Sequence, residues 1–286
     1  MIQPADYDFL SQFFEQRTGA LLGPGKEFLL QARLVPLAQS WGLGSLHDLV
    51  EELRHTASSP LGAAVLDLLT TPDTQFYRDP ETFDDLRERL LPELMQARRA
   101  TRRLRIWSAA TGTGQEAYSA AIMLRDDFPD IGQWCVELLA TDLSIPAILR
   151  AAAGRYSQTE VQLGLPIRQL VRHFHPVDGA WQISDDLRRM IKFQALDLLE
   201  PFPSIGQFDL ILCRNVLSWF SPSEKRSVLE RLTQSLRPDG YLLLGAAESA
   251  WGLTQQWEPV EGCRSVAYTP TVSASGVLRI ADRVTA

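Results

Sequence analysis

The chain has 286 residues and a net charge of −7, with 45% hydrophobic and 22% charged residues. Such a length and composition are typical of a globular protein with one large or two modest domains. The acidic balance argues against general nucleic-acid binding, and no run approaches the roughly 20 apolar residues that span a bilayer. The N-terminus also lacks a signal-peptide pattern, so we expect a cytoplasmic protein without membrane insertion.

The first 70 residues predict a small helical domain. Apolar residues recur at helical spacing in three stretches, which glycines separate. These residues are Phe9, Leu10, Phe13 and Phe14, then Leu29, Leu30, Leu34 and Leu37, and then Leu46, Leu49, Val50 and Leu53. A linker and a helix follow over 71–98, and the helix is predicted from Glu81 to about Met95, with Pro92 as a kink or stop.

Beyond residue 98, short apolar runs alternate with amphipathic helices, an order typical of a mainly parallel, doubly wound α/β sheet. The predicted strands are 104–109, 136–140, 191–195, 210–213 and 240–245, and the predicted helices are 116–127, 145–154 and 222–236. An insert over about 156–190 interrupts this alternation with short β-type pieces and a hairpin at 176–179. We therefore expect a sheet domain over 99–270, followed by a tail over 271–286 that is disordered or a loose appendage.

The most informative stretch is RIWSAATGTGQEAYSAAIML, residues 105–124, in which a strand, a glycine turn and a helix follow one another. This order holds nucleotide-like ligands above the strand ends of an α/β sheet. Gly112 and Gly114 let the backbone approach a ligand, but the third glycine of a dinucleotide fingerprint is missing. Glu116, in the first turn of the helix, either contacts a ligand amine or only favours the helix dipole.

Polar residues end the other predicted strands at the same edge. Asp142 could accept from both hydroxyls of a ribose or could cap the next helix. Asp197 could accept from an adenine amino group, with Leu198 against the ring, or could be a simple turn aspartate. Arg214-Asn215-Val216 ends the fourth strand. Together these signals fit an adenosine cofactor without a pyrophosphate, so S-adenosylmethionine fits better than a nicotinamide dinucleotide.

Eight segments extend this interpretation over nearly the whole chain. They are DYDFL, QRTGALLGPGKEFLLQARL, LTTPDTQFYRD, RIWSAATGTGQEAYS, LLATDLS, FQALDLLE, FDLILCRNVLSWF and LRPDGYLLLGAAES. In this order they resemble the chemotaxis receptor methyltransferase family, known as CheR. The resemblance implies a Rossmann-like S-adenosylmethionine-dependent methyltransferase sheet with a small inserted β-subdomain, preceded by a small all-α domain over 1–70 that docks the receptor.

The resemblance also implies a reaction and the residues that carry it. The reaction is methyl transfer to glutamate side chains on the cytoplasmic domain of a methyl-accepting chemotaxis receptor, which leaves S-adenosylhomocysteine. Ala109 to Glu116 would hold the methionine half of the cofactor, and Arg78 would bind the methionine carboxylate or the incoming glutamate. The implied cofactor-binding set is Thr74, Arg78, Ala109, Gly112, Glu116, Asp142, Asp197, Leu198, Arg214, Asn215 and Val216. The implied catalytic set is Arg78, Arg214 and Trp219.

Two positions depart from the family pattern. Pro72 stands where an Asn is usual, and Trp219 stands where a Tyr normally lies near the transferring methyl. The indole lacks the phenol oxygen, although its face can pack against a sulfonium. Because a carboxylate needs no general base to attack a methyl group, we predict reduced or retuned activity rather than none. The departures leave a second interpretation open, a regulator that binds S-adenosylmethionine with weak or no transfer. A methyltransferase for another protein or a small acid, and a nicotinamide oxidoreductase, are further alternatives.

Features outside the predicted site add smaller expectations. Arg17, Lys26 and Arg33 are the basic residues available for receptor docking, or are simply solvated. The compact insert argues against tethering to a receptor C-terminal peptide, and we expect a monomer. The arginines from Arg98 to Arg105 are interpreted as a solvated linker or helix end, and a local basic patch is the alternative.

The cysteines and histidines indicate no metal site. Cys135, Cys213 and Cys263 are widely spaced, and the first two lie in apolar runs typical of small buried side chains. His173 and His175, two apart on a predicted strand, would point the same way. Without a third ligand we interpret them as surface histidines and predict no bound metal.

Overall fold

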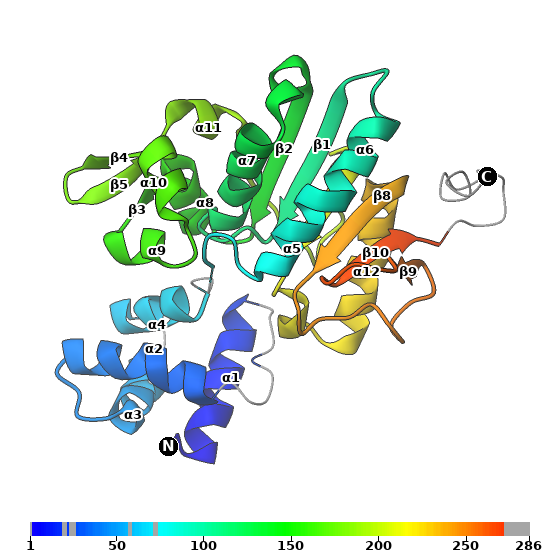
Figure 1. Ribbon diagram of the computed structural model, residues 1–286. Helices are drawn as coiled ribbons and strands as arrows, with labels where there is room; N and C mark the ends of the chain where they lie inside the picture. Colours follow the sequence, from blue (N-terminus) through cyan, green and yellow to red (C-terminus); the bar gives the residue numbers. More distant parts are fainter. Residues whose placement is uncertain (1, 19–21, 23–26, 57–58, 71–73, 272–286) are drawn as a thin grey trace.

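The structure is a computed structural model and describes residues 2–18, 22, 27–56, 59–70 and 74–271. Its N-terminal part packs helices into a small bundle, drawn in blue in Figure 1. These helices are α1 (Pro4–Thr18), α2 (Glu27–Ser40), α3 (Leu46–Thr56) and α4 (Pro60–Thr70). Leu10, Leu34 and Leu53 are fully buried in one shared core. This core stabilises the bundle, because isolated helices of such length are marginal in water.

The larger part is built on a sheet whose strands run in the order β6-β2-β1-β7-β8-β10-β9. Their bounds are β1 (Arg103–Ala109), β2 (Cys135–Asp142), β6 (Ile191–Ala195), β7 (Phe208–Cys213), β8 (Leu236–Leu244), β9 (Trp257–Pro259) and β10 (Ala267–Pro270). The strands from β6 to β8 in this order are parallel, which confirms the predicted fold class. The chain reverses its direction of winding between β1 and β7, and α/β sheets bind ligands at such a switch point.

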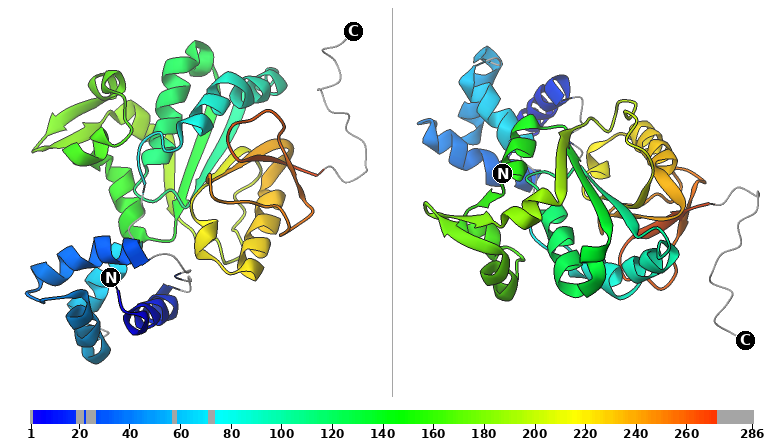
Figure 2. Two further views of the ribbon diagram at one scale, coloured as in Figure 1. Left: turned by 60° about the horizontal axis from the view of Figure 1, so that its bottom comes forward. Right: turned by 90° about the horizontal axis from the view of Figure 1, so that it is seen from above.

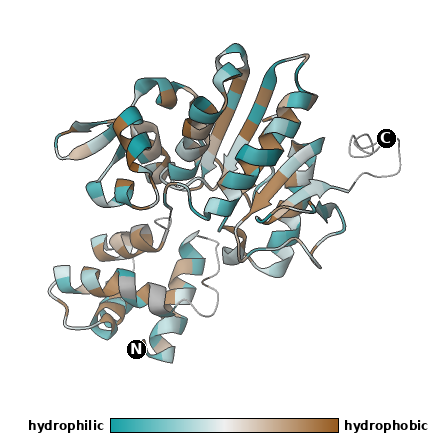
Figure 3. Ribbon diagram, viewed as in Figure 1, coloured by the Kyte–Doolittle hydropathy of each residue, from teal (hydrophilic) through white to brown (hydrophobic). Residues whose placement is uncertain are grey.

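Helices cover both faces of this sheet (Figures 1 and 2). They include α5 (Pro80–Asp85), the π-helical turn η1 (Leu86–Leu90), α6 (Leu91–Ala97), α7 (Gln115–Asp127), α8 (Ile145–Ala153) and α12 (Pro222–Ser235). Neighbouring strand residues alternate between two cores: Ile106 and Leu210 belong to one, Trp107 and Ile211 to the other. Both faces are therefore apolar, and Figure 3 shows hydrophobic colour along the strands.

The predicted insert forms a second sheet, with strand order β3-β5-β4. Its elements are β3 (Arg155–Tyr156), α9 (Gln158–Gln162), α10 (Ile167–His173), β4 (Phe174–Val177), β5 (Ala180–Ile183) and α11 (Asp185–Arg189). The predicted hairpin joins β4 to β5. Its turn residues Asp178 and Gly179 have φ of 46° and 74°, and a type I′ turn requires both to be positive.

Two local expectations are wrong, and a third is wrong in part. Cys135 is exposed, because it begins β2 three residues before Leu138, the first residue of β2 that pairs with β6. His173 ends α10 rather than lying on a strand, and it is buried with Nε2 2.9 Å from Oδ1 of Asp126. Pro92 does not stop its helix, because helical backbone continues from α5 through the π-helical turn η1 into α6, and that turn is the local irregularity directly before the proline.

Some expectations concern residues outside the described ranges, and two short strands were not predicted. Pro72, Lys26 and the tail over 272–286 lie outside the described residues. Strands β9 and β10 give no periodic signal, because they have three and four residues. None of the helices in the described ranges is long and apolar enough to cross a membrane.

A buried carboxylate joins the segment after α6 to the main sheet. Asp209, in β7, is fully buried, and its oxygens accept from Nε of Arg98 at 2.7 Å and from the backbone N–H of Arg105 at 2.8 Å. Arg98 also donates to Asp239, and these two carboxylates raise the pKa of its guanidinium. Part of the arginine cluster interpreted as solvated is therefore a structural ion pair.

We predict that Asp209→Ala lowers the free energy of unfolding by about 3 kcal/mol, because it leaves Arg98 and a backbone N–H without their buried partner. Asp239→Ala removes the other partner of Arg98, and the side chain of Asp239 is 54% exposed. That control should cost about 1 kcal/mol or less. Urea denaturation of the two variants tests this, and equal losses would contradict it.

Candidate active site

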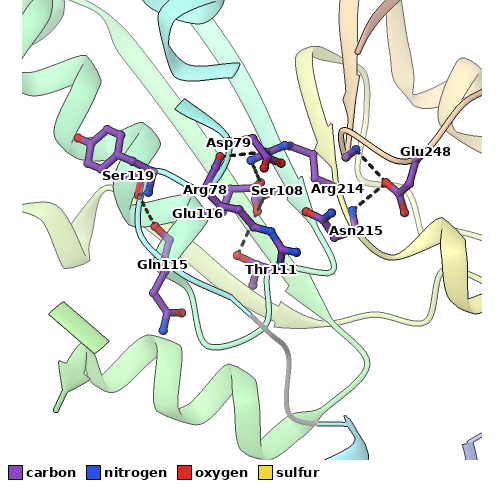
Figure 4. A network of polar contacts seen from close by, with 12 residues as sticks. Arg78, Asp79, Ser108, Thr111, Gln115, Glu116, Ser119, Arg214, Asn215 and Glu248 are labelled. Carbon is purple, nitrogen blue, oxygen red and sulfur yellow. Dashed lines mark hydrogen bonds and ion pairs between the residues drawn. The ribbon is translucent and has the colours of Figure 1, made fainter. Parts of the chain in front are cut away.

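The candidate site lies where the carboxyl ends of β1, β2 and β7 meet the linker that precedes α5 (Figure 4). Four residues other than glycine with left-handed backbone cluster there: Tyr77, Asp79, Ala110 and Asn215, with φ between 48° and 61°. Such conformations are costly for side chains with a Cβ and persist where the surrounding contacts enforce them. The loops at this edge are therefore held in defined shapes.

The glycine turn after β1 is held from two sides. The backbone N–H of Gly112 donates to Oδ2 of Asp142 at 2.8 Å, and the hydroxyl of Tyr156 donates to the carbonyl of Thr113 at 2.8 Å. Gly114 has φ of 94°, and a Cβ there would lie 2.9 Å from the Cβ of Ala151 in α8. This second glycine is thus required by helix packing as well as by the turn.

Asp142 is tied to the backbone through both oxygens. Besides Gly112, it accepts from the N–H of Ser144 at 2.9 Å. Ser144 itself caps α8 by accepting from the N–H of Ala147, so Asp142 is not the helix cap. Burial raises the pKa of the Asp142 carboxyl. A fixed, partly desolvated carboxylate at the tip of the second strand is suited to accept from vicinal hydroxyls.

Arg214 is the centre of the polar network in Figure 4. Its guanidinium is 2% exposed and donates to Oε2 of Glu116 at 2.9 Å, to the carbonyl of Arg78 at 2.8 Å and to Oδ2 of Asp79 at 2.7 Å. The other oxygen of Glu116 accepts from the hydroxyl of Ser108 at 3.0 Å. One side chain from the end of β7 thereby joins β7 to α7 and to the linker.

The linker is also anchored by its aromatic residues. Phe76 is fully buried, and its ring packs edge-on against Tyr156 and Phe174 of the insert, with centroids 5.1 and 5.7 Å apart. The N–H of Tyr77 donates to the hydroxyl of Ser119 in α7 at 3.0 Å. Arg78 follows directly and lies beside Arg214 in Figure 4. The segment implied to reach the cofactor is therefore fixed at its base.

Glu248 fixes the strand end that carries Arg214 and Asn215. Its carboxylate is buried and accepts backbone N–H groups from Asn215 at 2.7 Å, Gly245 at 2.8 Å and Ser218 at 3.2 Å. A Cβ at Gly245 would lie 2.6 Å from the side-chain nitrogen and 2.9 Å from the backbone nitrogen of Asn215, so only glycine allows this approach. Glu248 thus stabilises the left-handed conformation of Asn215.

The remaining predicted residues differ in their exposure. Ala109 is fully buried and Leu198 is 5% exposed, both within the apolar core that includes Trp107. Oδ1 of Asp197 accepts from the N–H of Leu199 at 2.8 Å, a turn contact that leaves its other oxygen without a partner among the described residues. Thr74 and Val216 are partly exposed.

Trp219 is placed differently from the other predicted residues. It ends the 3-10 turn η3 (Leu217–Trp219), and its ring lies 5.9 Å from that of Phe14 in α1. This side chain, which we predict to lie beside the transferring methyl, therefore also contacts the helical bundle.

Asp79, Tyr156 and Glu248 hold loops of the site and are absent from the predicted sets. Asp79 and Glu248 lie within the segments LTTPDTQFYRD and LRPDGYLLLGAAES, so the family resemblance covers both positions, although no task was predicted for either side chain. Tyr156 lies outside every quoted segment. Its contact with Thr113 spans 43 positions in the chain and depends on how the insert folds.

The charge of the site distinguishes between ligand classes. Asp79, Glu116, Asp142 and Asp197 outnumber the two guanidiniums of Arg78 and Arg214. An excess of carboxylates favours a cationic sulfonium and amine and disfavours a diphosphate. Nε of Arg214 is buried without a hydrogen-bond partner among the described residues, so a donor remains in the site. These residues fit S-adenosylmethionine. In the described ranges no group of His, Cys, Asp and Glu side chains is placed to hold a metal.

A Rossmann-like sheet with this acidic site defines an S-adenosylmethionine-dependent methyltransferase. Residues 72–266 match the CheR methyltransferase SAM-binding domain, and residues 5–70 match the CheR methyltransferase all-alpha domain. The chain belongs to the CheR methyltransferase family.

Several curated relatives are similar over most of their length. Chemotaxis protein methyltransferase 1 of Pseudomonas aeruginosa is 38% identical over 269 residues, which cover 92% of this chain and 97% of the relative. Chemotaxis protein methyltransferase of Vibrio anguillarum is 38% identical over 270 residues, covering 93% and 97%. Chemotaxis protein methyltransferase 1 of Vibrio cholerae is 36% identical over 271 residues, covering 93% and 97%.

We predict that Asp142→Ala weakens binding of S-adenosylhomocysteine by about tenfold to a hundredfold. The variant removes a charged acceptor from the ribose position and also frees the N–H of Gly112. Asp185→Ala, at a 70% exposed carboxylate in the insert, is the matched control and should bind as the unaltered protein does. Titration calorimetry measures both, and an unchanged affinity for Asp142→Ala would contradict the assignment.

Proposed function

We propose that this protein is a cytoplasmic protein-glutamate O-methyltransferase that acts on the signalling domain of a methyl-accepting chemotaxis receptor. The observation that carries the proposal is the pairing of an acidic cofactor site with two guanidiniums, Arg78 and Arg214, at one switch point. The acids suit the cationic cofactor, and a guanidinium suits a carboxylate substrate. The relatives named chemotaxis protein methyltransferases support the receptor as the substrate class.

Each residue of the site has a proposed task. Asp142 accepts from the ribose hydroxyls, Asp197 faces the adenine side, and Glu116 binds the methionine amine. The bound cofactor supplies an electrophilic methyl group on a sulfonium. Arg214 holds Glu116 and the linker in place, and Arg78 binds a carboxylate, either that of the methionine or that of the incoming glutamate.

No residue of the site needs to remove a proton from the substrate. A glutamate side chain is ionised at neutral pH, so its oxygen is already nucleophilic. The protein contributes alignment of the carboxylate and partial exclusion of water, which together account for large rate effects in bimolecular reactions. The products are a methyl ester and S-adenosylhomocysteine.

We assign receptor docking to the helical bundle over 1–70. Of its predicted basic contacts, Arg17 is exposed and its guanidinium lies 5.5 Å from the ring centroid of Phe13. Arg33 is partly buried and donates to the carbonyl of Leu68 at 2.9 Å, so part of its hydrogen bonding stabilises the bundle. Of these two described arginines, one is therefore exposed and one is partly engaged within the bundle, and we infer that shape contributes to docking beside charge.

Transfer of tritium from labelled S-adenosylmethionine to purified receptor cytoplasmic fragments tests the function. We predict base-labile methanol release from receptor fragments and its loss when the accepting glutamates are replaced by glutamine. Arg78→Ala should slow transfer about a hundredfold, because a bidentate contact to a carboxylate is removed. Arg168→Ala, an exposed arginine of α10, is the matched control.

The same variant separates the two tasks open to Arg78. If its guanidinium binds the methionine carboxylate, Arg78→Ala also weakens binding of S-adenosylhomocysteine; if it binds the incoming glutamate, that affinity is unchanged. An absence of base-labile methanol release across a panel of receptors would contradict the proposed function.

A further inference from the structure

Trp219 belongs to two parts of the molecule at once. Its position in the chain is the turn η3, three residues after the strand end Arg214-Asn215-Val216. Its ring lies 5.9 Å from that of Phe14, at an interplanar angle of 44°. Phe14 is 3% exposed and belongs to the core of the helical bundle. Among the described hydrophobic residues, Trp219 is the only one from beyond α4 that packs against this core.

The backbone beneath Trp219 is fixed to the site. Its own N–H donates to the carbonyl of Val216 at 3.0 Å, and the N–H of Ser218 donates to Oε1 of Glu248 at 3.2 Å. Glu248 also holds Asn215 and Gly245, as described above. A displacement of the indole therefore acts on the same loop that presents Arg214 and Asn215, because one buried carboxylate holds the whole segment.

We propose that Trp219 is a positioning residue that fixes the helical bundle relative to the methyl-transfer site by packing on Phe14. This inference rests on the proposed function, in which the bundle docks the receptor. A receptor held by the bundle then presents its glutamate to a site whose position relative to α1 this aromatic pair helps to fix. The role differs from contact with the sulfonium, because it acts through Phe14, a residue outside the cofactor site.

The chemistry of the pair explains why an indole suits this place. An aromatic pair adds an attraction beyond simple burial, and tryptophan has the largest aromatic surface. The departure from the family pattern at Trp219 is thus matched by an apolar partner in this chain.

The test compares Phe14→Leu, Trp219→Leu and the double variant with the unaltered protein. Leucine removes the ring and keeps an apolar side chain, so the bundle still folds. Phe9→Leu is the matched control, because Phe9 is on the same helix and stacks on Phe13 instead. We expect Phe14→Leu and Trp219→Leu each to lower kcat for a receptor fragment about fivefold, with the Kd for S-adenosylhomocysteine within twofold. The double variant should be no slower than either single variant.

A second measurement does not depend on any receptor. Trp219→Leu should speed hydrogen exchange in α1, and Phe14→Leu should speed it in residues 216–220, because each residue restrains the other segment. If neither segment responds to the substitution in the other, the proposal is overturned. It is also overturned if Trp219→Leu weakens S-adenosylhomocysteine binding while Phe14→Leu leaves kcat unchanged. If no receptor fragment is methylated, the proposed function fails, and the exchange experiment still decides the linkage.

Discussion

The buried guanidinium of Arg214 joins parts of the chain that no secondary-structure element connects. It bridges Glu116 on α7, Asp79 in the linker and the carbonyl of Arg78, and it extends from the end of β7. Only a planar group with several donors can serve three acceptors in these directions, and a lysine ammonium cannot reproduce that arrangement. Burial makes the arrangement strict, because any partner lost would leave a charge without compensation. This one side chain therefore fixes the end of β7, the start of α7 and the linker relative to one another.

Around that centre, the molecule holds each loop of the site from behind. Glu248 restrains the strand end, Tyr156 of the insert restrains the glycine turn, and Phe76 anchors the linker between insert and sheet. Such support positions the ligand-binding groups before the ligand arrives, which lowers the entropy cost of ordering these groups on binding. The insert therefore supports the cofactor site through Tyr156 and Phe174, the two rings against which Phe76 packs, although it lies outside the main sheet. Trp219 extends the same principle from the site to the helical bundle.

The alternation of apolar runs and helices was sufficient to predict the α/β class, because parallel strands buried on both faces leave a strong signal in the chain. The polar residues at strand ends, such as Asp142 and Arg214, could be predicted as one cluster for the same reason. The contact partners of these polar side chains could not be predicted. The pairing of Arg214 with Asp79 spans 135 positions, and the burial of His173 against Asp126 depends on where α10 packs. The helix stop at Pro92 and the burial of Cys135 were wrong predictions, because a π-helical turn and a strand that begins before its neighbour's first paired residue leave no pattern in local sequence.

The most direct measurement is calorimetric titration of S-adenosylhomocysteine into Arg214→Lys, with circular dichroism to establish that the variant is folded. The lysine keeps the positive charge and loses the planar set of donors, so the links to Glu116 and the linker cannot all persist. We predict a loss of affinity of about thirtyfold or more, in keeping with the loss of two charge-assisted hydrogen bonds. An affinity within twofold of that of the unaltered protein would show that the cofactor site does not depend on the Arg214 network.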